Sequence, residues 1–232
     1  MRIAGLQKLT LLDFPGHTAS TVFLPGCNFR CPFCHNAELV IESEPTDNIS
    51  IDEFFAFLEK RHGLLDGVCI TGGEPLLQHD LAEFCARIKQ KGFAVKLDTN
   101  GSLPERLREL VKAELVDYVA MDIKNTPQRY GETTGVASFD LVSIQDSIDF
   151  LMGGHLPYEF RTTVVRELHS PDDLLAIARW IKGAAAWHLQ SFVDADSILS
   201  GAGTLHAYEL NQLEALLPEL RRYVPATQLR GV

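Results

Sequence analysis

The chain has 232 residues, of which 46% are hydrophobic and 22% charged, and its formal net charge is −10. An acidic surface repels phosphate backbones, so the composition disfavours a nucleic-acid partner. No apolar run approaches the roughly 20 residues that span a bilayer, and the first residues lack the apolar core of a secretory signal. With only five cysteines, all compatible with a reducing compartment, we expect a cytoplasmic protein without a membrane segment.

Apolar strand patterns alternate with amphipathic helix patterns, which indicates a parallel sheet with crossover helices. After a lead-in strand or hairpin at 2–11, strands are expected at 19–24, 67–71, 94–97, 118–121, 158–165 and 187–192. Helices are expected at 51–61, 79–90, 104–113, 141–152, 171–182 and 208–223. A polar connection at 37–50, a loop at 125–139 and an edge pairing of 228–232 complete the pattern.

These elements form six βα units, too few for a complete eight-fold barrel. The fold class predicted is therefore α/β, with an open, partial (β/α)6 barrel similar to a TIM barrel. We expect a single domain over 1–232, made of a lead-in at 1–17, the partial barrel at 18–193 and a C-terminal loop and helix at 194–232.

Three cysteines, Cys27, Cys31 and Cys34, follow the first barrel strand in the pattern C-x3-C-x2-C. A single tight loop can direct all three thiolates at one metal centre, and thiolates are the usual ligands of iron–sulfur clusters. A cubane takes four ligands, so one iron would stay open for an exchangeable ligand, as in catalytic metal sites. Structural zinc is the alternative, but its fourth ligand is missing, because His35 lies too close along the chain.

The two remaining cysteines, Cys69 and Cys85, lie in apolar segments. A free cysteine in such a setting is most often a small buried hydrophobic residue. We therefore do not expect a second cluster.

Glycine-rich or polar residues follow each of the first four barrel strands. They are the cysteine loop, Gly72-Gly73-Glu74, Asp98-Thr99-Asn100, and Asp122 with Lys124; Arg161 lies inside the fifth strand. Because the carboxyl ends of parallel strands meet at one face of a barrel, these groups are expected on one rim. Each alone also has a structural explanation as a turn, a capping loop or an exposed pair.

The chemistry of these side chains suggests a role for each. The glycine pair lets a ligand approach the backbone, since no Cβ intervenes. Glu74 can accept hydrogen bonds from an amino group, and Lys124 can donate to a carboxylate or to ribose hydroxyls. Asp98 and Asp122 can bind a cation or orient polar groups, and Phe33 offers an apolar face for a ring such as adenine.

Together these motifs resemble the radical S-adenosylmethionine (SAM) superfamily. Within it, the chain is similar to the activating enzymes of glycyl-radical enzymes, and most to those of anaerobic ribonucleoside-triphosphate reductase. The segments that carry this resemblance are Cys34-His35-Asn36, Leu97-Asp98-Thr99-Asn100-Gly101, Met121-Asp122-Ile123-Lys124 and the opening Leu9-Thr-x-x-Asp13-Phe-Pro-Gly16. The resemblance covers about the first two-thirds of the chain and implies a partial barrel of the radical SAM type.

The resemblance also implies a [4Fe–4S] cluster on the three cysteines, with the amino and carboxylate groups of SAM on the open iron. The cofactor-binding residues that it implies are Phe33 and His35 on the adenine side, Gly72, Gly73 and Glu74 at the amino group, Asp122 and Lys124 at the ribose or carboxylate, and Asp98 and Asn100 nearby, with a monovalent cation as an option. The reduced cluster would cleave SAM, and the 5′-deoxyadenosyl radical would take a hydrogen atom from a backbone glycine of a partner enzyme. The resemblance implies flavodoxin or ferredoxin as electron donor.

One position departs from the pyruvate formate-lyase activators, which have a His near the end of the sixth strand. Phe192 stands there in this chain, and Gln190 is a candidate for part of that role. This departure argues against a formate-lyase-type activator. A small-molecule enzyme similar to the 7-carboxy-7-deazaguanine synthases, and a non-enzymatic zinc module, are the alternatives.

Overall fold

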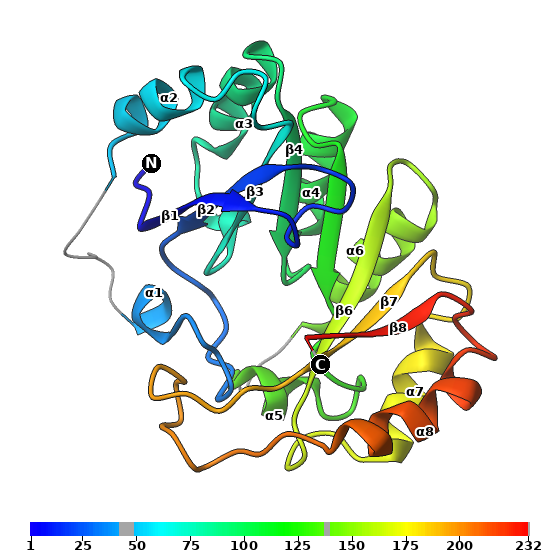
Figure 1. Cartoon of the computed structure of the whole chain (residues 1–232). Helices are drawn as coiled ribbons and strands as arrows, with labels where there is room; N and C mark the ends of the chain where they lie inside the picture. Colours follow the sequence, from blue (N-terminus) through cyan, green and yellow to red (C-terminus); the bar gives the residue numbers. More distant parts are fainter. Residues whose placement is uncertain (42–48, 137–139, 232) are drawn as a thin grey trace. The chain divides into compact units, whose positions relative to one another are not determined.

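A computed structural model describes residues 1–41, 49–136 and 140–231 of the chain (Figure 1). It divides into two compact units. The first comprises Met1–Asn28, Glu38–Thr99 and Leu103–Val119, and the second Phe29–Ala37, Asn100–Ser102 and Ala120–Val232. The single domain expected over 1–232 stays a prediction. In the described ranges, none of the helices combines the length and the apolar character that crossing a membrane would need.

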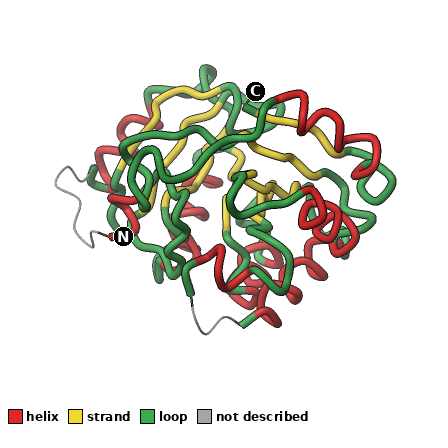
Figure 2. Tube along the Cα trace, turned by 90° about the horizontal axis from the view of Figure 1, so that it is seen from below, coloured by secondary structure: helices red, strands yellow, loops and turns green. Residues whose placement is uncertain are grey.

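Strands and helices alternate along both units (Figure 2). In the first unit the strands are β1 Gly5–Thr10, β2 Ala19–Leu24, β3 Gly67–Gly72 and β4 Ala94–Thr99. They pair in chain order, β1 antiparallel to β2 and the others parallel. The helical segments of this part of the chain are α1 Ala37–Ile41, α2 Ile51–Glu59, the 3-10 turn η1 Pro75–Leu77, α3 Leu81–Gln90 and α4 Pro104–Lys112.

The ends of β2 and β3 position the cysteine loop. The parallel register places Leu24 beside Gly72, so the loop that follows β2 starts next to the Gly-Gly segment that ends β3. Both strands are almost entirely buried, and near-continuous apolar runs of this kind are typical of parallel sheets covered on both faces. The first unit therefore fixes the start of the cysteine loop on two of its central strands.

In the second unit the strands β6 Tyr158–Val164, β7 Trp187–Ser191 and β8 Thr227–Arg230 pair in parallel. β5 Tyr118–Asp122 leads from the first unit into the second. The helices here are α5 Tyr130–Thr134, α6 Leu141–Met152, α7 Pro171–Trp180 and α8 Leu210–Leu220. α7 packs against α8, and α8 against β8 (Figure 1).

Strand alternation gives β6–β8 one apolar and one polar face. Phe160, Trp187 and Leu189 are fully buried on one face, where the Trp187 Nε1–H donates to Thr162 Oγ1 at 3.0 Å. The intervening residues of the same strands are polar or charged. The second unit thus keeps a polar face on its parallel strands.

Most expected elements are confirmed, including the strand at 19–24, the helix at 141–152 and the pairing of the C-terminal tail as β8. The capping box of Ser50 and Glu53 at the start of α2 is present. Two short helices were missed: α1 lies in the expected connection at 37–50, and α5 in the expected loop at 125–139. Both have five residues, too few for a recognisable helical period. Residues 42–48 of the expected connection, 137–139 of the expected loop and 232 of the expected C-terminal pairing lie outside the described residues.

Candidate active site

The five cysteines, all within the described residues, form no disulfide, and they fall into two environments. In the cysteine loop, Cys31 is buried and Cys27 and Cys34 are partly exposed; the Cys34 N–H donates to the Cys31 carbonyl at 3.0 Å. Cys69 and Cys85 are fully buried, which confirms the expectation for this pair. Burial raises the pKa of the Cys85 thiol to about 12, so it is not a ready thiolate ligand.

The glycine pair is required by the chain itself. The Gly73 N–H donates to the Leu24 carbonyl at 2.9 Å, and the Glu74 N–H to the Gly26 carbonyl at 2.8 Å. A Cβ on Gly73 would lie 1.9 Å from the Gly26 carbonyl oxygen and 3.3 Å from Cys27 Cβ. Gly72 has φ +118°, and a Cβ there would lie 2.3 Å from the Leu24 carbonyl oxygen. From the sequence, these glycines were expected to let a ligand approach the backbone. In the structure, their backbone also packs closely against the start of the cysteine loop.

Glu74 is completely buried and holds two neighbouring elements. Its Oε1 accepts the Leu76 N–H at 3.0 Å, at the start of η1, and the Thr99 hydroxyl at 2.8 Å, at the end of β4. These bonds give this carboxylate a structural task, and its predicted contact with the amino group of SAM stays a prediction.

Sequence reasoning missed Lys96, which lies on β4 two residues before Asp98. Its side chain is 1% exposed, forms an ion pair with the Asp98 carboxylate, and lies 3.8 Å from Cys69 Sγ. The available signal was a lysine inside the apolar strand Ala94–Thr99, because lysine is rarely buried unless it is paired. The resemblance suggested a monovalent cation near Asp98, and the ammonium group of Lys96 already places a positive charge beside this carboxylate.

Removing this lysine tests its role. Lys96→Met should lower the free energy of unfolding of the apo-protein by roughly 3–5 kcal/mol, because it leaves a largely buried carboxylate without its counter-charge. The double variant Lys96→Met with Asp98→Asn should recover much of that loss. Urea denaturation of the three proteins measures both effects. A loss below about 1 kcal/mol in the single variant would contradict the assignment, since that is the value of an exposed pair.

Asn100 and Gly101 form a turn fixed by β5 and α6. Asn100 Oδ1 accepts the Ser102 N–H at 2.9 Å, and the Gly101 carbonyl accepts the Ser147 hydroxyl at 2.7 Å. Gly101 has φ +76°, and a Cβ there would lie 2.1 Å from Met121 Cε. This part of the predicted site therefore has a clear packing function, as a capping loop would.

In the second unit, the groups at the end of β5 form a charged cluster. Asp122 bonds Lys124 Nζ at 2.8 Å through one oxygen and Arg161 Nε at 2.9 Å through the other. Lys124 Nζ also lies 5.9 Å from the centroid of the Phe33 ring, in cation–π geometry. Burial raises the pKa of Asp122, but the charges of Arg161 and Lys124 outweigh it and lower that pKa to about 2. Phe33, Asp122, Lys124 and Arg161 therefore lie close together, and their predicted role in binding SAM stays a prediction.

This shift predicts an acid dependence of stability. Because the folded-state pKa of Asp122 lies below its unfolded value, the stabilisation is present above about pH 4 and is lost as the pH falls toward 2. It should amount to about 2 kcal/mol. The difference in free energy of unfolding between wild-type apo-protein and Asp122→Asn should therefore shrink from pH 5 to pH 2.5. An unchanged difference over that range would refute the shift.

His35 and the C-terminal segment meet at the cysteine loop. The His35 Nε2 lies 2.6 Å from the Val193 carbonyl oxygen, and its ring centroid lies 5.7 Å from that of Phe192. Phe192, which stands where the formate-lyase activators have a His, is buried and packs on His35. The Leu199 N–H donates to the Cys34 carbonyl at 3.2 Å, and the following N–H to the Pro32 carbonyl at 3.0 Å. These contacts between distant parts of the chain had no signal in the sequence.

The donor set of the loop suits an iron–sulfur cluster, because three cysteine thiols outside any disulfide lie on one short segment. Across the part of the chain that the structure describes, no three His, Cys, Asp or Glu side chains are grouped to hold one metal ion. A cubane makes a different demand from a single ion, since its thiolate ligands bind different iron atoms.

Comparison with known proteins identifies the class. Residues 21–169 match the family model described as the radical SAM superfamily. A candidate glycyl-radical enzyme activating enzyme of Methanocaldococcus jannaschii is 31% identical, over 99% of this chain and 96% of that protein. The pyruvate formate-lyase-activating enzyme of Listeria monocytogenes is 28% identical, over 78% of this chain and 76% of its own.

Among solved structures, SuiB of Streptococcus suis bound to S-adenosylmethionine matches 91% of this chain with a TM-score of 0.69 at 13% identity. The matched part is 52% of that protein, so the chain spans about half of its length and shares its fold. The α/β fold class predicted from the sequence is thereby confirmed.

The chain belongs to the radical SAM superfamily of enzymes, in its family of glycyl-radical enzyme activating enzymes. Membership implies a [4Fe–4S] cluster and SAM as cofactors and a glycyl-radical enzyme as partner. It sets aside the non-enzymatic zinc module.

Proposed function

We propose that this enzyme installs the glycyl radical of anaerobic ribonucleoside-triphosphate reductase. The single observation that carries the proposal beyond the family is Phe192, which is buried against His35 where the formate-lyase activators have a His. The opening segment that resembles the reductase activators supports it. There Thr10 Oγ1 accepts the Leu12 and Asp13 N–H groups, and Asp13 accepts the Thr21 hydroxyl at 2.6 Å.

In this proposal Cys27, Cys31 and Cys34 hold the cluster. When bound, the cluster supplies the electron that cleaves SAM and so starts the removal of a hydrogen atom from the glycine. The chain itself binds and orients. Lys124 and Asp122 hold the ribose or carboxylate end of SAM, and Phe33 and His35 line the adenine. The backbone of Gly72 and Gly73 and the carboxylate of Glu74 meet the amino group of SAM, as the resemblance implies, and Asp98 and Asn100 are expected nearby.

The monovalent cation at Asp98 stays a prediction, and Lys96 argues for an internal substitute. Its ammonium group is buried beside this carboxylate and neutralises it. We therefore propose that SAM cleavage by the loaded enzyme does not need added potassium or ammonium ions. The electron donor, flavodoxin or ferredoxin, and a cytoplasmic location are likewise proposals.

The test mixes the anaerobically reconstituted, reduced protein with SAM and the reductase of the same organism. The expected result is a glycine-centred doublet in the electron paramagnetic resonance spectrum of the reductase, with one 5′-deoxyadenosine formed per radical. Mutating the radical-bearing glycine to alanine should remove the signal. SAM cleavage without any radical in the reductase would refute this partner, and a radical in pyruvate formate-lyase alone would reassign it.

A small-molecule substrate of the 7-carboxy-7-deazaguanine synthase kind is the second candidate. It predicts SAM turnover that is stimulated by a small molecule and needs no protein partner. Fold and cofactor do not decide between the two, because one site architecture serves many substrates.

A further inference from the structure

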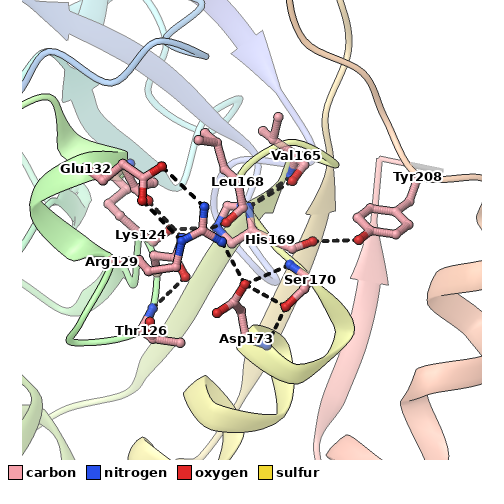
Figure 3. Close-up of polar contacts among 12 residues, drawn as sticks. Lys124, Thr126, Arg129, Glu132, Val165, Leu168, His169, Ser170, Asp173 and Tyr208 are labelled. Carbon is pink, nitrogen blue, oxygen red and sulfur yellow. Dashed lines mark hydrogen bonds and ion pairs between the residues drawn. The ribbon is translucent and has the colours of Figure 1, made fainter.

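The imidazole of His169 is buried and bonded at both nitrogens (Figure 3). It lies between β6 and α7, directly before Ser170, which caps α7. Its Nδ1 lies 3.1 Å from the Val165 backbone nitrogen, and its Nε2 2.8 Å from the Lys124 carbonyl oxygen. Nδ1 also lies 3.3 Å from the Val165 carbonyl oxygen, but the Lys124 carbonyl at Nε2 can only accept a hydrogen bond. The proton therefore lies on Nε2, which donates to Lys124.

This neutral form is the one that the surroundings favour. Burial lowers the pKa of His169, against the hydrogen bonds to Lys124 and Val165 and the nearby carboxylate of Asp173, which act to raise it. Arg129 is the nearby cation, and it is held by Asp173 at 2.8 Å and by Glu132. A second proton on Nδ1 would end its acceptance of the Val165 N–H and leave only the longer contact to the Val165 carbonyl oxygen, 3.3 Å away.

The bond from His169 is one of several that fix the chain around Lys124. The Lys124 N–H donates to the Tyr130 hydroxyl at 3.3 Å, and Asn125 Nδ2 donates to the Leu168 carbonyl at 2.9 Å. Consecutive residues after β5 are thus bonded to consecutive residues before α7. The Lys124 side chain leaves this fixed backbone toward Asp122 and Phe33.

The segment before α8 also contacts His169, through its backbone carbonyl. The Tyr208 hydroxyl donates to the His169 carbonyl at 2.6 Å (Figure 3). Tyr208 lies just before α8, in the C-terminal part of the chain for which the sequence suggested no role. His169 therefore joins the end of β5, the β6–α7 loop and the C-terminal segment.

We propose that His169 is a positioning residue for the SAM site: it holds the backbone carbonyl of Lys124 and so directs the lysine side chain, without touching the ligand. This inference rests on the proposed role of Lys124 in binding SAM. The alternative is that the imidazole only stabilises the fold.

Two substitutions separate these readings, because each keeps one of the two bonds. In His169→Gln the side-chain amide can reach the place of Nε2 and still donate to Lys124. In His169→Asn the shorter amide can still accept from Val165 but does not reach Lys124. Both variants lose one hydrogen bond inside the same buried site, so we expect similar losses of stability in urea denaturation.

The first measurement is the affinity of the reconstituted, unreduced proteins for SAM by isothermal titration calorimetry. His169→Gln should bind within about threefold of wild type, and His169→Asn about tenfold more weakly, which corresponds to about 1.4 kcal/mol. Equal affinities for the two variants, or losses that follow their stabilities, would overturn the inference.

The second measurement needs no cofactor. Hydrogen exchange of the apo-protein should show faster exchange of the Asn125 and Thr126 amides in His169→Asn than in His169→Gln. Equal exchange in the two variants would overturn the proposed hold on Lys124. If wild-type protein fails to bind SAM, the proposed function fails, whereas the exchange result still decides whether His169 fixes this segment.

Discussion

Replacing Gly73 with alanine is expected to abolish cluster assembly and to destabilise the apo-protein by more than about 3 kcal/mol. The added Cβ would lie 1.9 Å from the Gly26 carbonyl oxygen, a backbone atom that cannot move without shifting Pro25–Cys27. Overpacking of this kind in a rigid site typically costs 1–3 kcal/mol and occasionally more. The measured quantities are the iron content after anaerobic reconstitution and the urea midpoint of the apo-protein.

Gly63 supplies the control for this experiment. It has φ +76°, and a Cβ there would meet nothing within 4 Å, so Gly63→Ala carries conformational strain alone. That strain should cost about 1 kcal/mol and leave the iron content unchanged. If Gly73→Ala retained full iron content, the close approach of the glycine pair to the cysteine loop would not govern cluster binding.

The second large effect concerns Glu159, a fully buried carboxylate on β6. It accepts two hydrogen bonds from Arg230 of β8, at 2.7 and 2.9 Å, and lies 3.3 Å from the His188 Nε2 of β7. Burial acts to raise the pKa of Glu159, but the hydrogen bonds to His188 and Arg230 together have the larger effect. The pKa therefore lies well below its usual range, and the carboxylate is ionised. Glu159→Gln should therefore cost roughly 3–5 kcal/mol, because it leaves the Arg230 guanidinium without its buried counter-charge.

The same substitution at Glu167 gives a matched comparison. Glu167 also pairs with a histidine, His206, at 2.7 Å, but both side chains are substantially exposed. Glu167→Gln should change the free energy of unfolding by no more than about 1 kcal/mol. Equal effects of the two substitutions in urea denaturation would show that Glu159 does not hold the strands β6–β8 together.

Local sequence signals were sufficient for the elements that carry the site. The apolar run of β2 ends at a Pro-Gly pair, and α2 begins after Ser50, whose hydroxyl accepts the Glu53 N–H at 3.1 Å. Such signals depend on residues close in sequence, so they survive without knowledge of the fold. α5 lacks a side-chain cap and includes Gly131, so its five residues gave no such signal.

The candidate site residues were predicted because their motifs follow strand ends, but their structural roles in the fold were not predicted. Glu74 and Gly73 make structural contacts within the chain in addition to their proposed contacts with SAM. Lys96 and His169 stabilise the fold around the site through an ion pair and a hydrogen bond. A strand pattern cannot show that a buried lysine finds its aspartate, or that a histidine bonds a carbonyl 45 residues away. These features depend on tertiary contacts, which only the folded chain displays.

We expect Cys27, Cys31 and Cys34 to hold a cubane whose remaining iron binds SAM. The direct measurement is electron paramagnetic resonance of the reduced, reconstituted protein before and after SAM is added. The expected result is a [4Fe–4S]⁺ signal that changes on addition of SAM in wild type and in Cys69→Ala, and that is lost in Cys34→Ala. A signal that SAM leaves unchanged, or one that persists without Cys34, would contradict it.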